Sequence, residues 1–248
     1  MEWEIRNERR NNTIYTDDNF MYKVFKKVYS KNDVFMESFI TTYIESLGIN
    51  VVSIDEVTQI DGQWTFKSKR HPGKTLFELI NENPENPEKT EEYLNQLVEI
   101  QTGIHKFKCP ELPVQRQKFT DYINISNLDN SLKIDLQEML NSSPKHKKVC
   151  HGNFTPHNVL ISDGEVFILD WNHATQGNAS ADVARTYLWM KLYMPTFADS
   201  YLEKFCEKTN TSSRYVKNWV PIVAASRIHK NNPEEIRLLR DEISVVEY

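Results

Sequence analysis

The sequence predicts an α+β fold, with strands in its first part and helices after them. Short apolar segments separated by polar turns fill residues 3–28, and residues 51–69 continue this pattern around an Asp61-Gly62 turn. Beyond Gly73, apolar residues recur mainly at helical spacing. These observations favour a β-rich domain at residues 1–70 and a mainly helical domain at residues 71–248.

The expected elements follow in order along the chain. Strands are expected at residues 3–6, 12–16, 20–28, 51–57 and 64–69, with a linker at 71–75. A helix that begins near Val34 should end at Gly48, because glycine is the usual residue after a helix C-terminus. Later helices are expected at residues 75–83 and 91–107, followed by two shorter amphipathic segments, a β-hairpin and four terminal helices.

Composition excludes several classes of protein. The 248 residues are 39% hydrophobic and 26% charged, as is typical of a globular chain that can bury a core. The net charge of −5, with acids and bases interleaved, argues against a nucleic-acid partner. No apolar run approaches the roughly 20 residues of a membrane span. Three widely spaced cysteines form no disulfide or metal-binding pattern, so we expect a cytoplasmic protein.

The first indication of function is a motif between His151 and Asp170. His151, Asn158 and Asp170 fit the kinase-type pattern H-R-D-x-x-x-x-N followed by an aspartate at a strand end. Mg²⁺ prefers hard oxygen ligands, and Asp170 offers a carboxylate while Asn158 offers an amide oxygen. An isolated His-Gly or Asp-Trp dipeptide is ordinary turn or core sequence, but this combination at fixed spacing favours a nucleotide and Mg²⁺ site.

The position of the catalytic base does not fit the pattern, because it holds Asn153 in place of an aspartate. An amide accepts hydrogen bonds but has no useful basicity near neutral pH. A general base contributes about 10²- to 10⁴-fold in rate, so we expect a slow enzyme or an inactive one.

A β-hairpin should bring the two candidate ligands together. Apolar residues at 159–161 and 166–169 flank Asp163-Gly164, which is a strong signal for a type I′ turn. Asn158 would precede the first strand and Asp170 would follow the second. The two side chains are therefore expected at the same end of the hairpin.

The segments HGNFTPHNVL, ILDW and GNASADVART resemble the aminoglycoside phosphotransferase and choline kinase superfamily, and WVPIVAASRI resembles the tail helices of a bacterial branch of it. The resemblance extends from about residue 20 onward. It implies a two-lobed, protein-kinase-like fold with a small β-rich nucleotide-binding lobe and a larger helical acceptor lobe. The implied activity is transfer of the γ-phosphate of ATP to a hydroxyl of a small molecule, whether aminoglycoside-like, choline-like or other.

The resemblance assigns functions to individual residues. It places Asn153 at the catalytic-base position, makes Asn158 and Asp170 the Mg²⁺ ligands, and makes Asp182 a structural residue. Lys23 matches the phosphate-contacting lysine and Glu37 the helix carboxylate that pairs with it, while the adjacent Lys26 and Lys27 compete with Lys23 for the assignment. By sequence statistics alone, Lys23 is an ordinary solvated strand lysine and Glu37 an ordinary acid on a helix surface. The main chain near Ser68 and Lys69 is expected to face the adenine.

The N-terminal segment departs from kinase patterns, because no glycine precedes Gly48 to let a loop approach phosphates closely. Arg9 and Arg10 either contact phosphates or form a solvated surface. Two functions therefore remain open: a slow ATP- and Mg²⁺-dependent phosphotransferase, or an inactive nucleotide-binding or regulatory module. Residues 73–248 contain 20 basic and 24 acidic side chains, an excess that would suit a cationic acceptor but is too small to decide.

Overall fold

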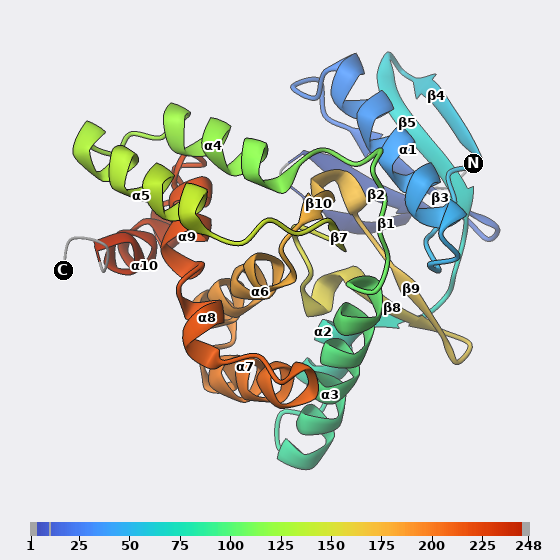
Figure 1. Ribbon diagram of the computed structural model, residues 1–248. Helices are drawn as coiled ribbons and strands as arrows, with labels where there is room; N and C mark the ends of the chain where they lie inside the picture. Colours follow the sequence, from blue (N-terminus) through green and yellow to red (C-terminus); the bar gives the residue numbers. More distant parts are fainter. Residues whose placement is uncertain (1–3, 10, 245–248) are drawn as a thin grey trace. The chain divides into compact units, whose positions relative to one another are not determined.

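The computed structural model describes residues 4–9 and 11–244, so Arg10 and the first residue of the strand expected at 3–6 lie outside the described residues. The chain forms two compact units (Figure 1). The first unit comprises Met1–Asn81 and His157–Asn172, and the second comprises Glu82–Pro156 and His173–Tyr248. This division differs from the expected single boundary near residue 70, because the hairpin after residue 157 groups with the N-terminal strands.

The first unit contains a five-stranded antiparallel sheet in the order β1-β2-β3-β5-β4 (Figure 1). Its strands are β1 (Glu4–Glu8), β2 (Asn12–Thr16), β3 (Phe20–Phe25), β4 (Glu56–Ile60) and β5 (Gln63–Lys69). Asp17 closes the turn between β2 and β3, since its carboxylate accepts hydrogen bonds from the backbone N–H groups of Asn19 and Phe20. The strand expected at 51–57 is wrong in extent: Val51 forms only an isolated bridge, and β4 begins at Glu56.

Helix α1 (Lys31–Ser46) joins β3 to β4 and packs on this sheet. Ser30 and Asp33 form a capping box at its N-terminus, and Gly48 follows its C-terminus with a φ of +79°, as expected from the sequence. Val34 from α1 packs with Phe25 and Phe66 in a buried cluster. The sheet thereby fixes the orientation of α1.

A second, three-stranded sheet in the first unit has the order β6-β8-β9. Its strands are β6 (Lys74–Thr75), β8 (Val159–Ser162) and β9 (Glu165–Ile168), and helix α2 (Leu76–Asn81) follows β6 directly. Residues expected to form only a linker thus include a short strand. The linker prediction missed β6 because its partner β8 lies far away in the sequence.

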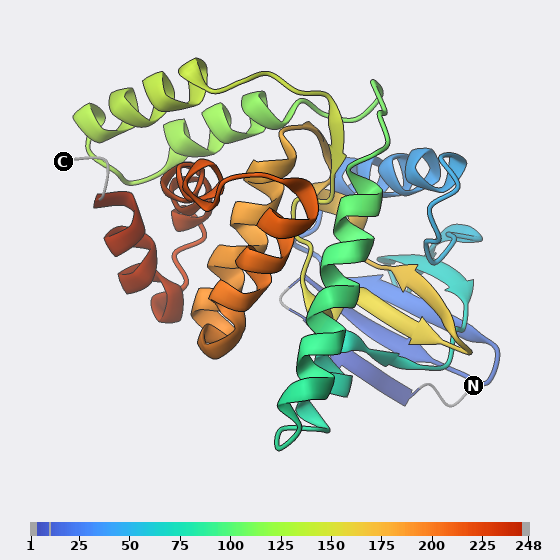
Figure 2. The same ribbon diagram turned by 60° about the horizontal axis from the view of Figure 1, so that its bottom comes forward.

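The second unit is mainly helical (Figure 2). Its helices are α3 (Pro87–Ile104), α4 (Gln115–Ile125), α5 (Asn130–Ser142), α6 (Ala179–Tyr193), α7 (Pro195–Thr209), α8 (Ser213–Lys217), α9 (Val220–Ile228) and α10 (Pro233–Ser244). A two-stranded sheet joins β7 (Lys148–Cys150) to β10 (Thr175–Gly177). Helix α6 packs against α7, α8 and α9, and α4 also packs against α9.

The order of strands and helices confirms the predicted α+β class. Five helices follow the hairpin within the described residues, one more than the four expected, because the break at Asn210 separates α7 from α8. No helix in the described part of the chain is long and apolar enough to cross a membrane.

Candidate functional site

Lys23, Glu37 and Asp170 meet inside the first unit. Lys23 Nζ on β3 donates to Glu37 Oε1 on α1, and it lies 3.0 Å from Asp170 Oδ1, two residues beyond β9. The three side chains are 11%, 5% and 15% exposed. Lys23 is thus not the solvated strand lysine that the sequence alone allowed, nor is Glu37 a surface acid.

The local folding explains why Glu37 is buried. Val34, Glu37, Thr41 and Ile44 occupy the buried face of α1 at helical spacing, so the carboxylate points the same way as the core residues. A buried carboxylate is costly unless a cation pairs with it. Lys23 is that cation, while Glu37 Oε2 remains buried without a hydrogen-bond partner among the described residues.

Electrostatics keep Lys23 charged. Burial alone would lower the pKa of its ammonium, but the carboxylates of Asp170 and Glu37 outweigh burial and raise the pKa above its ordinary value. Lys23 therefore presents a fixed positive charge at every physiological pH.

Asp170 also meets an arginine. Arg9 Nη1, from the turn between β1 and β2, lies 3.1 Å from Asp170 Oδ2. Asp170 has a φ of +66°, in the left-handed region where aspartate is one of the few tolerated residues. Two cations thus flank this carboxylate, one on each oxygen.

The hairpin of β8 and β9 positions Asn158 next to the same strand end. Asp163 and Gly164 have φ values of +49° and +81°, which confirms the turn with two left-handed residues that the sequence predicted. Val159 pairs with Ile168, and Leu169 N donates to Asn158 O at 2.9 Å. The backbone of buried Asn158 is therefore fixed beside the residue that precedes Asp170.

Ser68 and Lys69 lie at the end of β5, where they pair with Met21 and Phe20 of β3. The ladder between β4 and β5 ends earlier, at the pair Glu56 and Lys67. Within the described residues, the main chain at Ser68 and Lys69 therefore has a strand partner on one side only. That it faces an adenine stays a prediction.

Asn153 belongs to the second unit, in the loop that follows β7. Its backbone N–H donates to His151 Nδ1 at 3.2 Å. Asp182 on α6 holds this loop: Oδ1 accepts from Gly152 N at 2.7 Å, and Oδ2 accepts from His151 N at 3.2 Å. Asp182 thus fixes the backbone on the N-terminal side of Asn153, which agrees with the structural function implied by the family motif.

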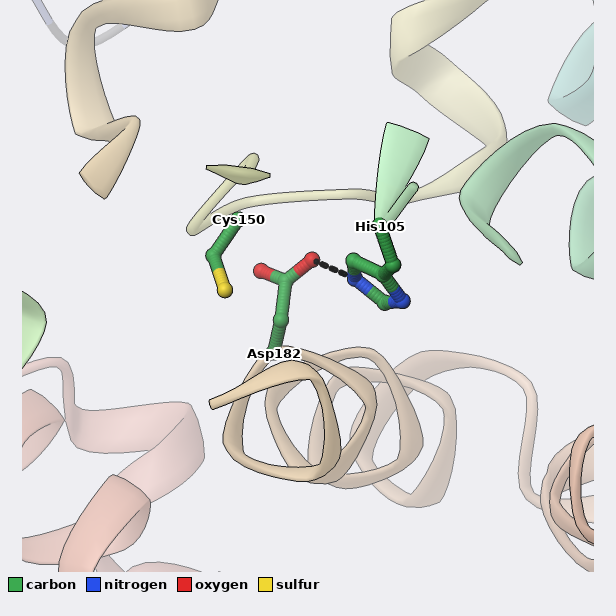
Figure 3. Close-up of side chains that lie close together, drawn as sticks. All are labelled: His105, Cys150 and Asp182. Carbon is green, nitrogen blue, oxygen red and sulfur yellow. Dashed lines mark hydrogen bonds and ion pairs between the residues drawn. The ribbon is translucent and has the colours of Figure 1, made fainter. Parts of the chain in front are cut away.

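Asp182 also forms part of a buried cluster with His105 and Cys150, which Figure 3 shows on either side of its carboxylate. His105 Nε2 lies 3.0 Å from Asp182 Oδ2. Burial alone would raise the pKa of Asp182, but the hydrogen bond from His105 is among the interactions that hold it below its ordinary value. Burial also raises the pKa of the Cys150 thiol far above its usual range.

Histidine, cysteine and aspartate are common metal ligands, but the hydrogen bonds of this cluster are those of a structural network. Both Asp182 oxygens already accept hydrogen bonds, from His105 and from the backbone at residues 151 and 152, and burial keeps the pKa of the Cys150 thiol well above its usual range. His105 is the C-cap residue of α3. The cluster therefore supports the loop around Asn153.

A pocket in the second unit was not predicted from the sequence. Three cations line it, namely Lys118 on α4, Arg185 on α6 and Lys230 after α9, and Gly152 lies in its wall. Its empty volume is about 460 Å³, including the open mouth. The three cations come from separate helices, so no local pattern in the sequence brought them together.

Comparison with known proteins identifies the family. Residues 16–215 match the model of the phosphotransferase enzyme family, so the chain belongs to that family. None of the curated proteins compared with this chain matches it.

Solved structures show the same fold. A thermostable variant of the aminoglycoside phosphotransferase APH(4)-Ia, in a ternary complex with AMP-PNP and hygromycin B, matches with a TM-score of 0.72 and 13% identity over 99% of this chain and 92% of that chain. The choline kinase LicA from Streptococcus pneumoniae matches with a TM-score of 0.68 and 12% identity over 100% and 93% of the two chains. An aminoglycoside-3'-phosphotransferase of type VIII matches with a TM-score of 0.67 and 14% identity over 91% and 93%.

These matches confirm the predicted superfamily and its protein-kinase-like fold. They cover nearly the whole chain, including the N-terminal strands that lack glycine. The missing glycines are therefore compatible with the fold.

Proposed function

We propose that this protein transfers the γ-phosphoryl group of ATP, with Mg²⁺, to a hydroxyl of a small molecule, and that it does so slowly. The observation that carries the proposal is the buried placement of Lys23 between Glu37 and Asp170. In kinase-type sites, a lysine paired with a helix carboxylate contacts nucleotide phosphates, and an aspartate at a strand end binds the metal. The same three residue types meet here on matching elements.

The nucleotide would bind to the first unit. Lys23 would contact its phosphates, with Glu37 holding the ammonium in place. The adenine would pair with the open main-chain edge at Ser68 and Lys69. Arg9 is a further cation within reach of phosphates, because it already lies at Asp170.

Asn158 and Asp170 fit a Mg²⁺ ion by the chemistry of their donors. An amide oxygen and a carboxylate are hard ligands, and Mg²⁺ in phosphoryl-transfer sites usually takes only one or two ligands from the protein. Bound Mg²⁺ supplies positive charge that stabilises the charge developing on the phosphoryl oxygens. The hairpin turn and the bond between Leu169 N and Asn158 O keep the two ligand residues close in the chain fold.

Asn153 would limit the rate. It occupies the base position of a loop that Asp182 holds in place, so the loop is ordered but lacks the proton acceptor. The acceptor hydroxyl must then lose its proton to solvent or to a substrate oxygen. Since phosphoryl transfer draws most of its catalysis from positioning and charge, activity about 10²- to 10⁴-fold below that of an aspartate enzyme is expected.

Asn153 equally favours a second function, that of a nucleotide-binding module without catalysis. Both functions use Lys23, Glu37, Asn158 and Asp170, so only turnover separates them. In the second function, nucleotide would bind to the same residues and regulate a partner.

The test compares the chain with its Asn153→Asp variant. MgATP should stabilise both proteins against thermal unfolding, because Asn153 does not bind the nucleotide. ATP turnover should be slow in the chain and rise by about 10²- to 10⁴-fold in the variant, because the carboxylate restores the base. Turnover is measured as ADP release in the presence of small hydroxyl compounds.

An Asp170→Asn variant serves as the negative control, because it weakens the metal site in either background. Binding without turnover, both in the unmodified chain and in its Asn153→Asp variant, would favour the regulatory module. Absence of any MgATP-dependent stabilisation in the unmodified chain would contradict both functions.

A further inference from the structure

The pocket in the second unit is cationic. Lys118 and Tyr122 lie one turn apart on α4, Arg185 lies on α6, and His229 and Lys230 follow α9. The rings of Tyr122 and His229 stack with centroids 4.6 Å apart and planes at 12°. Three positive side chains therefore share one small space beside an aromatic wall.

Acidic residues nearby offset this charge only in part, because burial and the neighbouring Arg227 outweigh the carboxylates of Asp182 and Glu235 at Arg185. Asp182 lines the pocket, but its oxygens accept hydrogen bonds from His105 and from the backbone at residues 151 and 152. Glu235 binds Arg227 through both of its carboxylate oxygens. Among the described residues, no carboxylate forms an ion pair with Lys118 or Arg185.

Hydrogen bonding is incomplete as well. Arg185 Nε is buried and has no hydrogen-bond partner in the described structure. The hydrogen bond of Lys118 Nζ goes to a backbone carbonyl, that of His173, at 3.3 Å. A buried donor without an acceptor lowers the stability of the fold. A ligand that accepts a hydrogen bond from Arg185 Nε would offset this cost.

The cations also oppose one another. Burial, and then the neighbouring Arg185, lower the pKa of Lys118 to about 8. Burial and the same arginine lower the pKa of Lys230 to about 7, and burial together with Arg227 lowers the pKa of Arg185 to about 10. An anion in the pocket would restore these charges and satisfy the free donor.

We propose that this pocket binds the anionic group, a carboxylate or a phosphate monoester, of a hydroxyl compound that is the phosphoryl acceptor. Arg185 supplies the planar donor pair for the anion, and Lys118 and Lys230 supply further charge. Gly152 in the pocket wall directly precedes Asn153, so the bound compound would lie beside the loop that carries the base position. The acceptor assignment rests on the proposed function, whereas the anion site stands on the pocket alone.

This acceptor class differs from aminoglycosides and choline. Those compounds carry positive charge, which Lys118, Arg185 and Lys230 would repel. The slight acidic excess of residues 73–248 does not predict the charge of the pocket, because most of the charged residues counted lie outside its lining. We therefore expect this chain to prefer an anionic acceptor, whereas its structural neighbours include an aminoglycoside phosphotransferase and a choline kinase.

Binding is tested without nucleotide, by titration calorimetry with three probes: glycerate, glycerol phosphate and choline. Glycerate and glycerol phosphate distinguish the carboxylate from the phosphate source, and choline represents a cationic acceptor. We expect at least one anion to bind and choline not to bind. Arg185→Gln should lower the affinity for the anion by about tenfold or more, because the substitution removes a charge-assisted hydrogen bond.

Lys217→Gln is the matched control, because Lys217 is an exposed lysine on α8 outside the pocket lining. It should bind the anion as the unmodified chain does. An Arg185→Lys variant, which keeps the charge, should retain part of the affinity even where Arg185→Gln folds poorly. Equal weakening by Lys217→Gln, binding of choline in preference to both anions, or no binding of either anion would each overturn the anion site.

A parallel titration with MgATP separates this inference from the proposed function. If the unmodified chain binds MgATP but neither anion, the inference alone is overturned. If it binds an anion but not MgATP, the nucleotide site alone is overturned. The acceptor assignment is supported if the anion that binds increases ADP release by Asn153→Asp. It is overturned if that compound binds yet leaves ADP release unchanged in a variant that hydrolyses ATP.

Discussion

Lys23 shows most clearly how the surroundings of a residue distinguish a buried charged cluster from an ordinary surface. Its ammonium lies between two carboxylates from different elements, and its pKa is raised by them against the effect of burial. Lys26, three residues along, instead pairs with exposed Glu8. The resemblance selected Lys23 as the phosphate-contacting lysine, which stays a prediction. The structure shows that Lys23, unlike Lys26, is buried between two carboxylates.

Replacing Lys23 with methionine should abolish MgATP-induced stabilisation, because Glu37 and Asp170 would then repel both each other and the phosphates. Unfolding in urea should also show a loss of stability of about 3 kcal/mol, the typical cost of breaking a buried ion pair. Both are measured with and without MgATP. Lys27→Met, at an exposed position nearby, is the control and should change neither quantity appreciably.

A Lys23→Arg variant keeps the charge and guards against a trivial loss of folding. If Lys23→Met remained folded and kept the full MgATP shift, the proposed phosphate contact would be incorrect.

The cationic pocket could not be predicted from the sequence positions of its residues. Lys118, Arg185 and Lys230 stand more than forty residues apart in the chain. Each is a long basic side chain on or next to an amphipathic helix, and such residues are mostly solvated. Only the packing of α4, α6 and α9 shows that they share a pocket.

At the scale of elements, local signals predicted the hairpin well because its turn chemistry is strict. Asp163 and Gly164 adopt the two left-handed conformations that a type I′ turn needs. The strand predicted at residues 51–57 began too early, because apolar alternation also suits a segment that crosses between elements. Residues 51–55 contribute only the bridge from Val51 to Ile168, and β4 begins at Glu56. Strand β6 was missed because its pairing is not local.

The loop of Asn153 depends on Gly152 in a way that can be tested. Gly152 has a φ of +75°, and a Cβ there would lie 2.2 Å from the carbonyl oxygen of His173. Gly152→Ala should therefore destabilise the protein by about 1–3 kcal/mol, through backbone strain and the clash. The loop would also move away from Asp182, so under the proposed function the turnover should fall below that of the unmodified chain.

Gly103→Ala is the matched control. Gly103 lies in α3, and a Cβ there meets no atom within 4 Å. This substitution should leave turnover unchanged and raise stability by about 0.5–1 kcal/mol, since alanine favours helices over glycine. Chemical denaturation measures both variants. Equal stability of the two would show that the loop tolerates a side chain at residue 152.

On the scale of the molecule, net charge hides the distribution that matters for function. The chain carries a formal charge of −5, yet its second unit encloses a cationic pocket. The fold class was predictable because it depends on many residues with a shared period. The cationic pocket was not predictable because it depends on a few residues whose proximity only the packed helices create.

The pocket should also lower stability in a pH-dependent way. The pKa of Lys118 is about 8 in the folded protein and about 10.4 in an unfolded chain, so the unfolded state binds more protons between these values. Lys118 therefore destabilises the fold below pH 8, and this effect fades as the pH rises toward about 10.4. The charged and titratable groups that share its pocket are Arg185, Lys230, Asp182, His173, His229 and Tyr122.

Lys118→Met should raise the melting temperature at pH 7 by about 2–4 °C, which corresponds to about 1 kcal/mol after allowance for partial exposure. The increase in melting temperature relative to the unmodified chain should be smaller at pH 10. Scanning calorimetry at the two pH values measures it, with Lys217→Met as the surface control. An equal increase in melting temperature at both pH values would mean that the loss of charge repulsion does not cause the increase.

The pairing of Arg9 with Asp170 has a consequence for the order of events during ligand loading. Under the proposed function, a divalent ion that arrives alone must compete with a guanidinium already in place, which makes the first encounter weak. A triphosphate changes this competition, because its oxygens attract Arg9 away from the carboxylate. Cation and nucleotide should thus enter synergistically, each tightening the hold on the other, and neither should accumulate in the protein by itself.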